Sequence, residues 1–199
     1  MKNKANIWNL YAPVYDTFVK TNRDAYETLY QKIREVCFDK TVLEIATGTG
    51  LIAKHIAAAS KKTIATDFAE NMLKEAQKGI IPSNLEFRQA SAEALPFSDD
   101  SFDVVIIANA LHIISEPEKV LDEIARVLKP DGILIAPNYI HGDGDKKTAI
   151  MSKMLSIAGI AFEVKWNEET YVEFLEKNGW SVEDTDILEG SIPMMYTEC

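Results

Sequence analysis

Residues 42–53 constrain the fold of this chain more than any other segment. They begin with a continuous apolar run at 42–45, pass through a turn that contains Gly48 and Gly50, and continue as an amphipathic pattern. Continuous rather than alternating apolar runs are typical of strands buried on both faces of a parallel sheet. Glycines let a backbone approach a ligand closely, and the free N–H groups of a first helical turn suit an anionic group. The segment therefore predicts a buried strand, a ligand-binding turn and a helix.

The rest of the chain repeats this alternation of short apolar runs and amphipathic helical patterns, which is typical of βαβ units around a parallel sheet. The predicted strands span residues 41–46, 63–67, 84–89, 102–108 and 132–137, and the predicted helices span 69–78, 145–158 and 167–177. Ser115 and Glu118 read as a capping box for a further helix, which ends in a turn at 129–132. Asn167 is the expected cap of the helix at 167–177. Two more strands, joined at 189–191, are expected between 180 and 199, and the chain stops within the second, so a continuation past Cys199 is left open.

Length, composition and charge exclude several classes of protein and of partner. A chain of 199 residues, 47% hydrophobic and 26% charged, fits one ordinary globular domain. The apolar runs are too short to cross a bilayer, and the N-terminus lacks the apolar stretch of a signal peptide. Its two cysteines, Cys37 and Cys199, lack the spacing of a zinc site or a disulfide framework, so we expect no metal and a cytoplasmic location. A net charge of −10 without a dense basic patch argues against a nucleic-acid partner.

Two acidic residues on consecutive strands indicate the cofactor. Asp67 ends the strand after the glycine turn, where a carboxylate can bind both ribose hydroxyls of a nucleoside. Gly48, Gly50 and Ala53 also match a dinucleotide fingerprint, so an NAD(P)-binding oxidoreductase is an alternative. An acid beside the turn is unfavourable for a pyrophosphate, but it favours S-adenosylmethionine, which brings an ammonium and a sulfonium. Glu44 is that acid; alternatively, it pairs with a neighbouring basic side chain.

Four segments in order resemble class I S-adenosylmethionine-dependent methyltransferases. Residues 44–50 resemble motif I, and residues 66–73 are similar to the segment whose Asp holds the ribose. Residues 89–105 resemble the adenine-binding segment and fourth strand, and residues 126–132 resemble the turn before strand five. The resemblance implies an α/β, Rossmann-like, mostly parallel seven-stranded sheet of order 3-2-1-4-5-7-6, with strand 7 antiparallel and helices on both faces. It also implies one domain over 1–199, with an N-terminal helical lid at 1–20 and a helical acceptor-side insertion at 138–179.

The resemblance places the cofactor on residues that surround the ends of the first, second and fourth strands. They are Tyr11, Tyr15, Glu44, Ala46, Thr47, Gly48, Thr49, Gly50, Asp67, Phe68, Met72, Ser91, Ala92, Glu93 and Asn109. Two positions depart from the family pattern. Ala46 replaces the first glycine, which requires a negative φ there, and Ser91 replaces an Asp that accepts from the adenine amino group, a bond that a hydroxyl can still accept.

The acceptor side is less defined. Because a sulfonium is an activated leaving group, catalysis is chiefly positioning, with a base only where the acceptor loses a proton. The resemblance implies that residues 109–114, directly after the fourth strand, face the methyl group and hold the acceptor-side candidates. Within this segment, His112 is the candidate base, or it packs at a helix start. Four methionines (Met151, Met154, Met194 and Met195) line an apolar acceptor pocket or simply fill the core. Residues 126–130 resemble ubiquinone/menaquinone C-methyltransferases, but residues 137–139 lack the Glu-x-Ser of that group.

These observations predict a methyltransferase of class EC 2.1.1. It would transfer a methyl group from S-adenosylmethionine to an unidentified small-molecule acceptor by in-line displacement, leaving S-adenosylhomocysteine. We expect a monomer or homodimer without stable membrane insertion. Besides the oxidoreductase, a non-catalytic module that only binds S-adenosylmethionine is an alternative.

Overall fold

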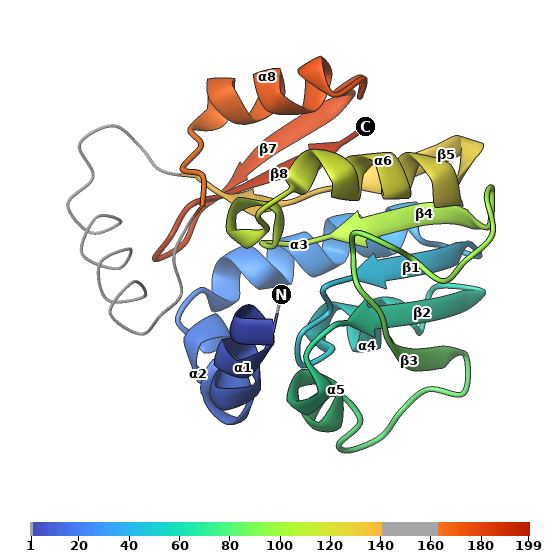
Figure 1. The fold of residues 1–199 in the computed structure, drawn as a ribbon, viewed down its shortest axis with the longest axis vertical. Coiled ribbons are helices and arrows are strands. Elements are labelled where there is room, and N and C mark those ends of the chain that lie inside the picture. The colour runs from blue at the N-terminus through green and yellow to red at the C-terminus, as the bar shows by residue number, and fades with distance from the viewer. Residues whose placement is uncertain (1, 141–162) are drawn as a thin grey trace.

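The computed structural model describes residues 2–140 and 163–199 and contains a twisted sheet with helices on both faces (Figure 1). The strands are β1 (Thr41–Ile45), β2 (Lys62–Asp67), β3 (Leu85–Gln89), β4 (Phe102–Ile107), β5 (Leu128–Ile135), β6 (Asn138–Tyr139), β7 (Asp184–Leu188) and β8 (Met194–Glu198). The helices are α1 (Lys2–Tyr11), α2 (Tyr15–Lys20), α3 (Arg23–Val36), α4 (Leu51–Ile56), α5 (Glu70–Ala76), α6 (Pro117–Val127) and α8 (Glu168–Lys177), with 3₁₀ turns η1 (Ala12–Val14) and η2 (Leu111–Ile113).

The strand order confirms the α/β Rossmann-like fold expected from the sequence. Strands β3, β2, β1, β4 and β5 pair in parallel in that spatial order. Strand β8 is antiparallel to β5 and pairs with β7 on its other side, so β8 and β7 take the places of the expected strands 7 and 6. The two-residue strand β6 follows β5 and also pairs with β8, an addition that the sequence pattern did not predict.

Alternation along the central strands divides the core into two layers. Leu43 and Ile45 of β1 pack in the cluster that contains the buried faces of α6 and α8. Val42 packs in the other cluster, with residues of α3 and α4. Since successive side chains of a strand point to opposite faces, Glu44 shares the α3–α4 face with Val42. This places a carboxylate inside an apolar layer, 2% exposed.

Local signals predicted some element ends correctly and others wrongly. The side chain of Asn167 accepts a hydrogen bond from Thr170 N, and the reciprocal bond is present, so the predicted cap of α8 is confirmed. The predicted capping box at Ser115 is wrong, because Glu116 is the N-cap residue of α6 and makes no side-chain cap. The predicted turn at 129–132 is a bulge within β5, where the register shifts between Phe102 and Val104 of β4. The helix predicted at 145–158 lies outside the described residues.

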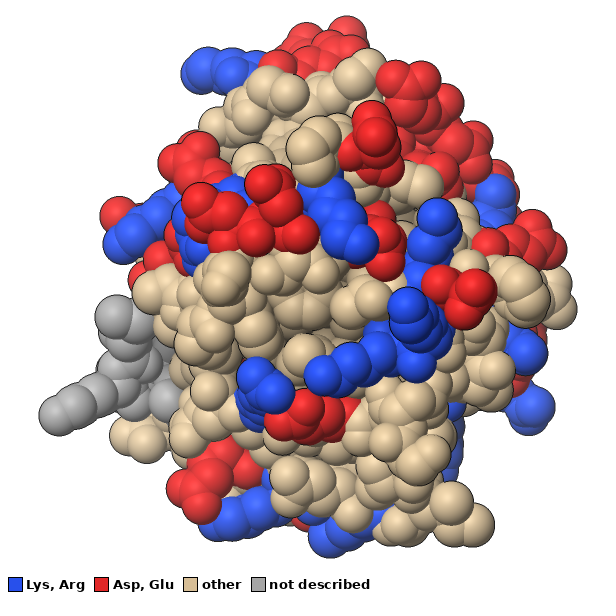
Figure 2. Space-filling model, turned by 90° about the vertical axis from the view of Figure 1, so that its right-hand side faces the viewer, with Lys and Arg blue, Asp and Glu red and all other residues tan. Residues whose placement is uncertain are grey.

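The charges on the surface and the lengths of the helices are relevant to the expectations about nucleic-acid and membrane partners. Figure 2 shows Lys and Arg interspersed with Asp and Glu on the face drawn there. Ion pairs such as Lys129 Nζ–Asp103 Oδ1 at 2.6 Å and Arg126–Asp99 at 2.8 Å neutralise charges locally. Within residues 2–140 and 163–199, each helix falls short of the length and apolar character needed to cross a membrane. The absence of a nucleic-acid partner stays a prediction.

Candidate functional site

A cavity of about 130 Å³ opens at the carboxyl ends of β1, β2, β3 and β4. In parallel sheets of this kind, ligands bind at the carboxyl edge, where the strand order reverses. The described residues that line the cavity are Trp8, Tyr15, Ala46, Gly48, Asp67, Phe68, Met72, Ala90, Ser91, Ala92, Glu93, Ala108, Asn109, Ala110, Ile113, Ile114 and Ser115.

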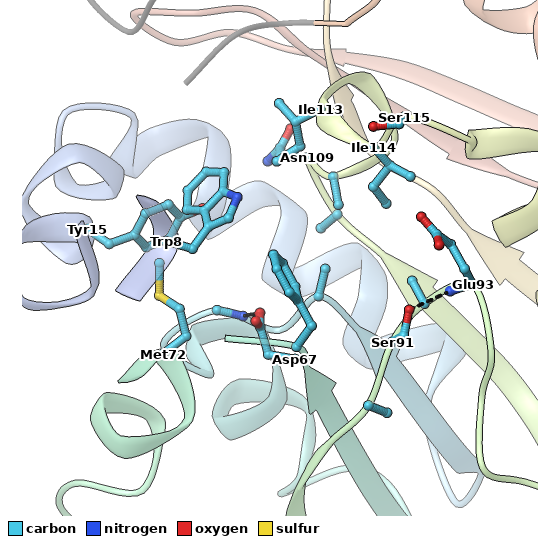
Figure 3. Close-up of a pocket in the computed structure, with 17 residues that line it drawn as sticks. Trp8, Tyr15, Asp67, Met72, Ser91, Glu93, Asn109, Ile113, Ile114 and Ser115 are labelled. Atoms are coloured by element: carbon cyan, nitrogen blue, oxygen red, sulfur yellow. Dashed lines mark hydrogen bonds between the residues drawn. The ribbon is translucent and has the colours of Figure 1, made fainter. Parts of the chain in front are cut away.

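The labelled side chains surround this hollow from several elements. Figure 3 shows Trp8 and Tyr15 of the N-terminal helices on one side and Ser91 and Glu93 on the other. Asp67 and Met72 lie along one border, and Asn109 with residues 113–115 lies opposite them (Figure 3). Among the described lining residues, two are acidic and none is basic. The wall therefore favours a neutral or cationic ligand over a pyrophosphate.

Asp67 is held firmly at the end of β2. Its Oδ2 accepts a hydrogen bond from Gly48 N at 2.9 Å, and its Oδ1 accepts one from Ala69 N at 2.8 Å. A carboxylate has about four acceptor positions, so both oxygens retain capacity for a ligand. Burial raises the pKa of Asp67, and the backbone N–H groups act in the opposite direction. The arrangement can receive a pair of hydroxyl groups.

Glu44 lies behind the glycine turn, in the wall of a smaller cavity that shares Tyr15, Ala46 and Ala108 with the larger one. Its Oε2 accepts a hydrogen bond from Thr47 Oγ1 at 2.7 Å. Burial raises the pKa of Glu44 to about 8. The ion pairs of the described residues include none with Glu44, so the alternative of a basic neighbour is not found there. Thr47 and Thr49 line the same smaller cavity.

The glycine turn requires left-handed backbone at three positions. Gly48 has φ +57° and Gly50 φ +75°, and a Cβ at Gly50 would come within 2.8 Å of the Phe87 ring. Ala46 has φ +55°, so the expectation of a negative φ is wrong. The reason is that the chain must leave β1 while Thr47 N still donates to Thr66 O at 2.9 Å on the neighbouring strand. Ala46 thus stays in a conformation that favours glycine.

The N-terminal helices contribute to the wall and are attached at two places. The rings of Trp8 and Tyr15 meet edge to face, with centroids 6.2 Å apart. Asn71 N, in the first turn of α5, donates to Asn9 Oδ1 at 2.8 Å. Thr49 Oγ1, just before α4, donates to Asp16 Oδ1 at 2.5 Å. Both attachments are made beside the predicted cofactor site.

Several predicted residues do not line the larger cavity. Tyr11 and Gly50 are outside its described wall, although Gly50 shapes the turn. His112 is buried in η2, where its Nδ1 lies 2.6 Å from Asn138 Oδ1, and it is not among the described lining residues either. Its role as a base stays a prediction.

The predicted acceptor methionines separate into two groups. Met194 and Met195 are buried in the two core clusters, which favours the core-filling alternative for them. Met151 and Met154 lie outside the described residues.

Sequence reasoning did not assign some wall residues to the site. Trp8, Ala90, Ala108 and Ser115 line the cavity without having been predicted as site residues, whereas Ala110, Ile113 and Ile114 belong to the segment 109–114 in which acceptor-side residues were expected. They are apolar or small, and their types alone do not distinguish a ligand wall from a protein core. The position of residues 108–115 directly after the fourth strand was the available signal, because carboxyl ends of parallel strands meet at one edge.

The chain is similar to known methyltransferases in sequence and in fold. Residues 43–136 match a family described as "Methyltransferase domain". A demethylmenaquinone methyltransferase of Renibacterium salmoninarum is 34% identical over 146 residues, which cover 72% of this chain and 61% of that protein. The chain spans 39% and 61% of the length of two such curated relatives.

Two solved structures extend the likeness in fold. A structure from Haloferax volcanii, solved in complex with the Trm112 methyltransferase activator, has a TM-score of 0.81 at 18% identity, covering 97% of this chain and 95% of that one. A SAM-dependent methyltransferase from Aquifex aeolicus has a TM-score of 0.68 at 24% identity, covering 88% and 89% of the two chains.

Proposed function

The chain belongs to the class I S-adenosylmethionine-dependent methyltransferases, and we propose that it transfers a methyl group from this donor to a small molecule by in-line displacement. The observation that supports this most is the presence of two carboxylates on neighbouring strands. Asp67 accepts hydrogen bonds from two backbone N–H groups at the cavity, and Glu44 is buried on the adjacent strand β1. Bound S-adenosylmethionine supplies a methyl group already activated by a positive sulfonium.

The residues of the cavity fit this donor by charge and by hydrogen-bonding capacity. Asp67 has acceptor positions left for ribose hydroxyls. Ser91 and Glu93 are proposed to flank the adenine, with Ser91 Oγ already accepting from Glu93 N at 3.3 Å. Burial raises the pKa of Glu44 to about 8, so we propose that Glu44 releases its proton when a ligand ammonium lies beside it and then supplies negative charge on the side of the glycine turn. A buried carboxylate without a cationic partner is costly, and a ligand ammonium would offset that cost.

The remaining cofactor residues hold the site in shape. Gly48 N orients the Asp67 carboxylate, Thr47 orients Glu44, and Thr49 attaches the turn to Asp16 of α2. Phe68 and Met72 supply apolar wall. Fixing groups before the ligand arrives reduces the reorganisation needed for reaction.

Residues 1–20 are proposed to act as a lid and residues 138–179 as the acceptor side of the single domain. The lid follows from Trp8 and Tyr15, which close one side of the cavity in Figure 3. Excluding water strengthens electrostatic positioning inside a site. We propose a small-molecule acceptor and a monomer or homodimer.

Calorimetric titration tests the choice of cofactor. S-adenosylhomocysteine should bind, while NADH should give no heat of binding, because the described wall has no basic residue for a pyrophosphate. Binding of NADH, or no binding of S-adenosylhomocysteine, would contradict the proposal and favour the oxidoreductase alternative.

A second experiment separates an enzyme from a binding module. Incubation with radiolabelled S-adenosylmethionine and a panel of phenols, amines, thiols and quinols should transfer label to at least one compound. Tight binding without transfer to any compound would support the non-catalytic alternative.

A further inference from the structure

The segment between β3 and β4 contains a short turn that forms part of the cavity wall. Ser91, Ala92 and Glu93 line the cavity from this turn, and Figure 3 shows Ser91 and Glu93 joined by a hydrogen bond. A bridge between Ser91 and Ala94 closes the turn, with Ala94 N donating to Ser91 O at 3.2 Å. Because the turn is closed on itself, its place in the wall depends on what holds its two ends.

The two ends of the turn are held by different parts of the fold. At the first end, Ala90 N donates to Asp67 O at 3.1 Å, which attaches the turn to the end of β2. At the second end, both backbone groups of Leu95 are bound by side chains of α6. Leu95 N donates to Glu123 Oε2 at 2.7 Å, and Leu95 O accepts from Arg126 Nη2 at 3.1 Å. The turn therefore connects the proposed ribose carboxylate to α6.

Arg126 uses its whole guanidinium for this attachment. Besides Leu95 O, it donates to Phe97 O and Asp99 Oδ1, each at 2.8 Å. It also donates to both carboxylate oxygens of Glu123, again at 2.8 Å. These five hydrogen bonds equal the number of N–H donors that a guanidinium has. Since a lysine ammonium lacks this planar fork, the attachment depends on arginine geometry and not on positive charge alone.

The pair of Arg126 and Glu123 acts mainly on irregular backbone. Their side chains are 31% and 21% exposed, and ion pairs at such accessible positions contribute little to stability through charge. Three of their hydrogen bonds go instead to backbone groups of residues 95–97, which lie outside helices and strands. Backbone groups in such a segment need partners from side chains or water. The pair therefore determines where this segment lies, and with it the second end of the turn.

We propose that Arg126, together with Glu123, is a positioning residue for the adenine ring of the methyl donor. The inference rests on the proposed function, in which Ser91 and Glu93 flank the adenine. Ser91 Oγ accepts one hydrogen bond from Glu93 N and, as a hydroxyl, can accept a second from the exocyclic amino group of adenine. Arg126 and Glu123 are outside the described cavity wall, so they act through the turn. Their role is to keep its acceptor in the place where it distinguishes adenine from other purines.

The test compares S-adenosylhomocysteine with S-inosylhomocysteine, which has a carbonyl oxygen in place of the exocyclic amino group. The measured quantity is the ratio of the two affinities, determined by calorimetry. A substitution that only destabilises the fold lowers both affinities alike and leaves this ratio unchanged. We expect the unmodified protein to prefer the adenosyl ligand about tenfold, as for one hydrogen bond. Arg126→Met should reduce the preference to about threefold or less, because the turn is no longer fixed at its second end.

A milder variant separates the guanidinium fork from its charge. Arg126→Lys keeps a cation and most of the apolar stem, so it also provides the test if Arg126→Met does not fold. One ammonium cannot replace the bonds to Leu95 O, Phe97 O and Glu123 together, so the preference should fall in this variant as well.

Lys129→Met is the matched control. It also removes a cation that is paired with a carboxylate, that of Asp103 at 2.6 Å, but this pair lies near the start of β4 and away from the turn. Its preference should equal that of the unmodified protein. An undiminished preference in Arg126→Lys, or equal binding of the two ligands by the unmodified protein, overturns this inference. Failure of S-adenosylhomocysteine to bind the unmodified protein instead overturns the proposed function.

Discussion

At the residue scale, the carboxylate of Asp67 joins the glycine turn to the proposed ribose site. If it binds both ribose hydroxyls, Asp67→Ala removes two charge-assisted hydrogen bonds, each worth about 1.5–3 kcal/mol at most. Affinity for S-adenosylhomocysteine should fall by roughly one to three decades, as measured by calorimetry.

Asp103→Ala is the matched control for this substitution. The Asp103 carboxylate also accepts from a backbone N–H, that of Thr41 at 2.8 Å, but it lies near the start of β4, away from the cavity. Affinity should stay unchanged in that variant. An unchanged affinity in Asp67→Ala would mean that the ribose binds elsewhere.

Glu44 predicts a pH dependence of stability. Its pKa is about 8 in the folded protein, above the value of roughly 4.3 for an unperturbed Glu. Between these values the folded state holds a proton that the unfolded state has lost, so stability falls as the pH rises through this window. Urea unfolding of Glu44→Gln at pH 5.5 and 8.5, compared with the unmodified protein, should show a smaller loss between the two pH values. Parallel losses would mean that Glu44 is ionised in the folded state.

Ala46 predicts a gain in stability on substitution by glycine. A left-handed residue other than glycine costs roughly 1–2 kcal/mol, and the flexibility of glycine in the unfolded chain offsets about 0.5–1 kcal/mol of the relief. Ala46→Gly should therefore raise the free energy of unfolding by up to about 1 kcal/mol, as measured by urea unfolding. Ala25→Gly, within α3, should lower it. Destabilisation by Ala46→Gly would show that the methyl group packs favourably despite its backbone.

At the element scale, strands were more predictable than the ends of helices. The predicted bounds of β1, β2, β3 and β4 lie within one residue of the observed bounds at each end. In β1 and β4, burial on both faces leaves few polar interruptions in the sequence. The predicted capping box at Ser115 is wrong because a serine followed three residues later by a glutamate does not by itself determine where the first helical turn begins. Pro117, whose φ is preset, begins α6 instead.

Site residues whose roles depend on nearby sequence were predicted, and those whose roles depend on tertiary contacts were not. Asp67 and the glycine turn could be predicted because their roles follow from adjacent strands and a short turn. The role proposed for Arg126 could not, because its hydrogen bond to Leu95 joins residues 31 positions apart. The positive φ of Ala46 was missed because it depends on pairing with β2.

The N-terminal helices should behave as an element of low local stability. If they form a lid, amides of residues 2–20 should gain protection from hydrogen exchange when S-adenosylhomocysteine is added. Asn9→Ala removes the acceptor for Asn71 N and should speed dissociation of S-adenosylhomocysteine about fivefold, as for one hydrogen bond.

Thr28→Ala is the control, since it removes an exposed hydrogen bond to Asp24 O on α3, outside the lid. Its dissociation rate should match that of the unmodified protein. Equal protection of residues 2–20 with and without the ligand would identify them as a fixed structural segment.

At the scale of the whole molecule, the cavity is a product of topology rather than of one motif. Its walls come from the N-terminal helices, the ends of β1, β2, β3 and β4, and the segments that follow them. These parts are brought together only by the folded sheet, so the unfolded chain has no comparable site. A ligand of the cavity must therefore stabilise the entire fold by mass action.

This predicts the size of a thermal shift as well as its direction. At a free concentration 100 times its dissociation constant, a ligand adds about 2.7 kcal/mol to the stability of the folded state. For a domain of this length, each kcal/mol raises Tm by roughly 2–4 °C, so S-adenosylhomocysteine should raise Tm by about 5–11 °C. NADH at the same concentration should give no shift, and in Asp67→Ala the shift at unchanged ligand concentration should shrink in step with the lost affinity. A shift that survives in Asp67→Ala while calorimetric affinity is lost would show that the ligand stabilises the protein from a different site.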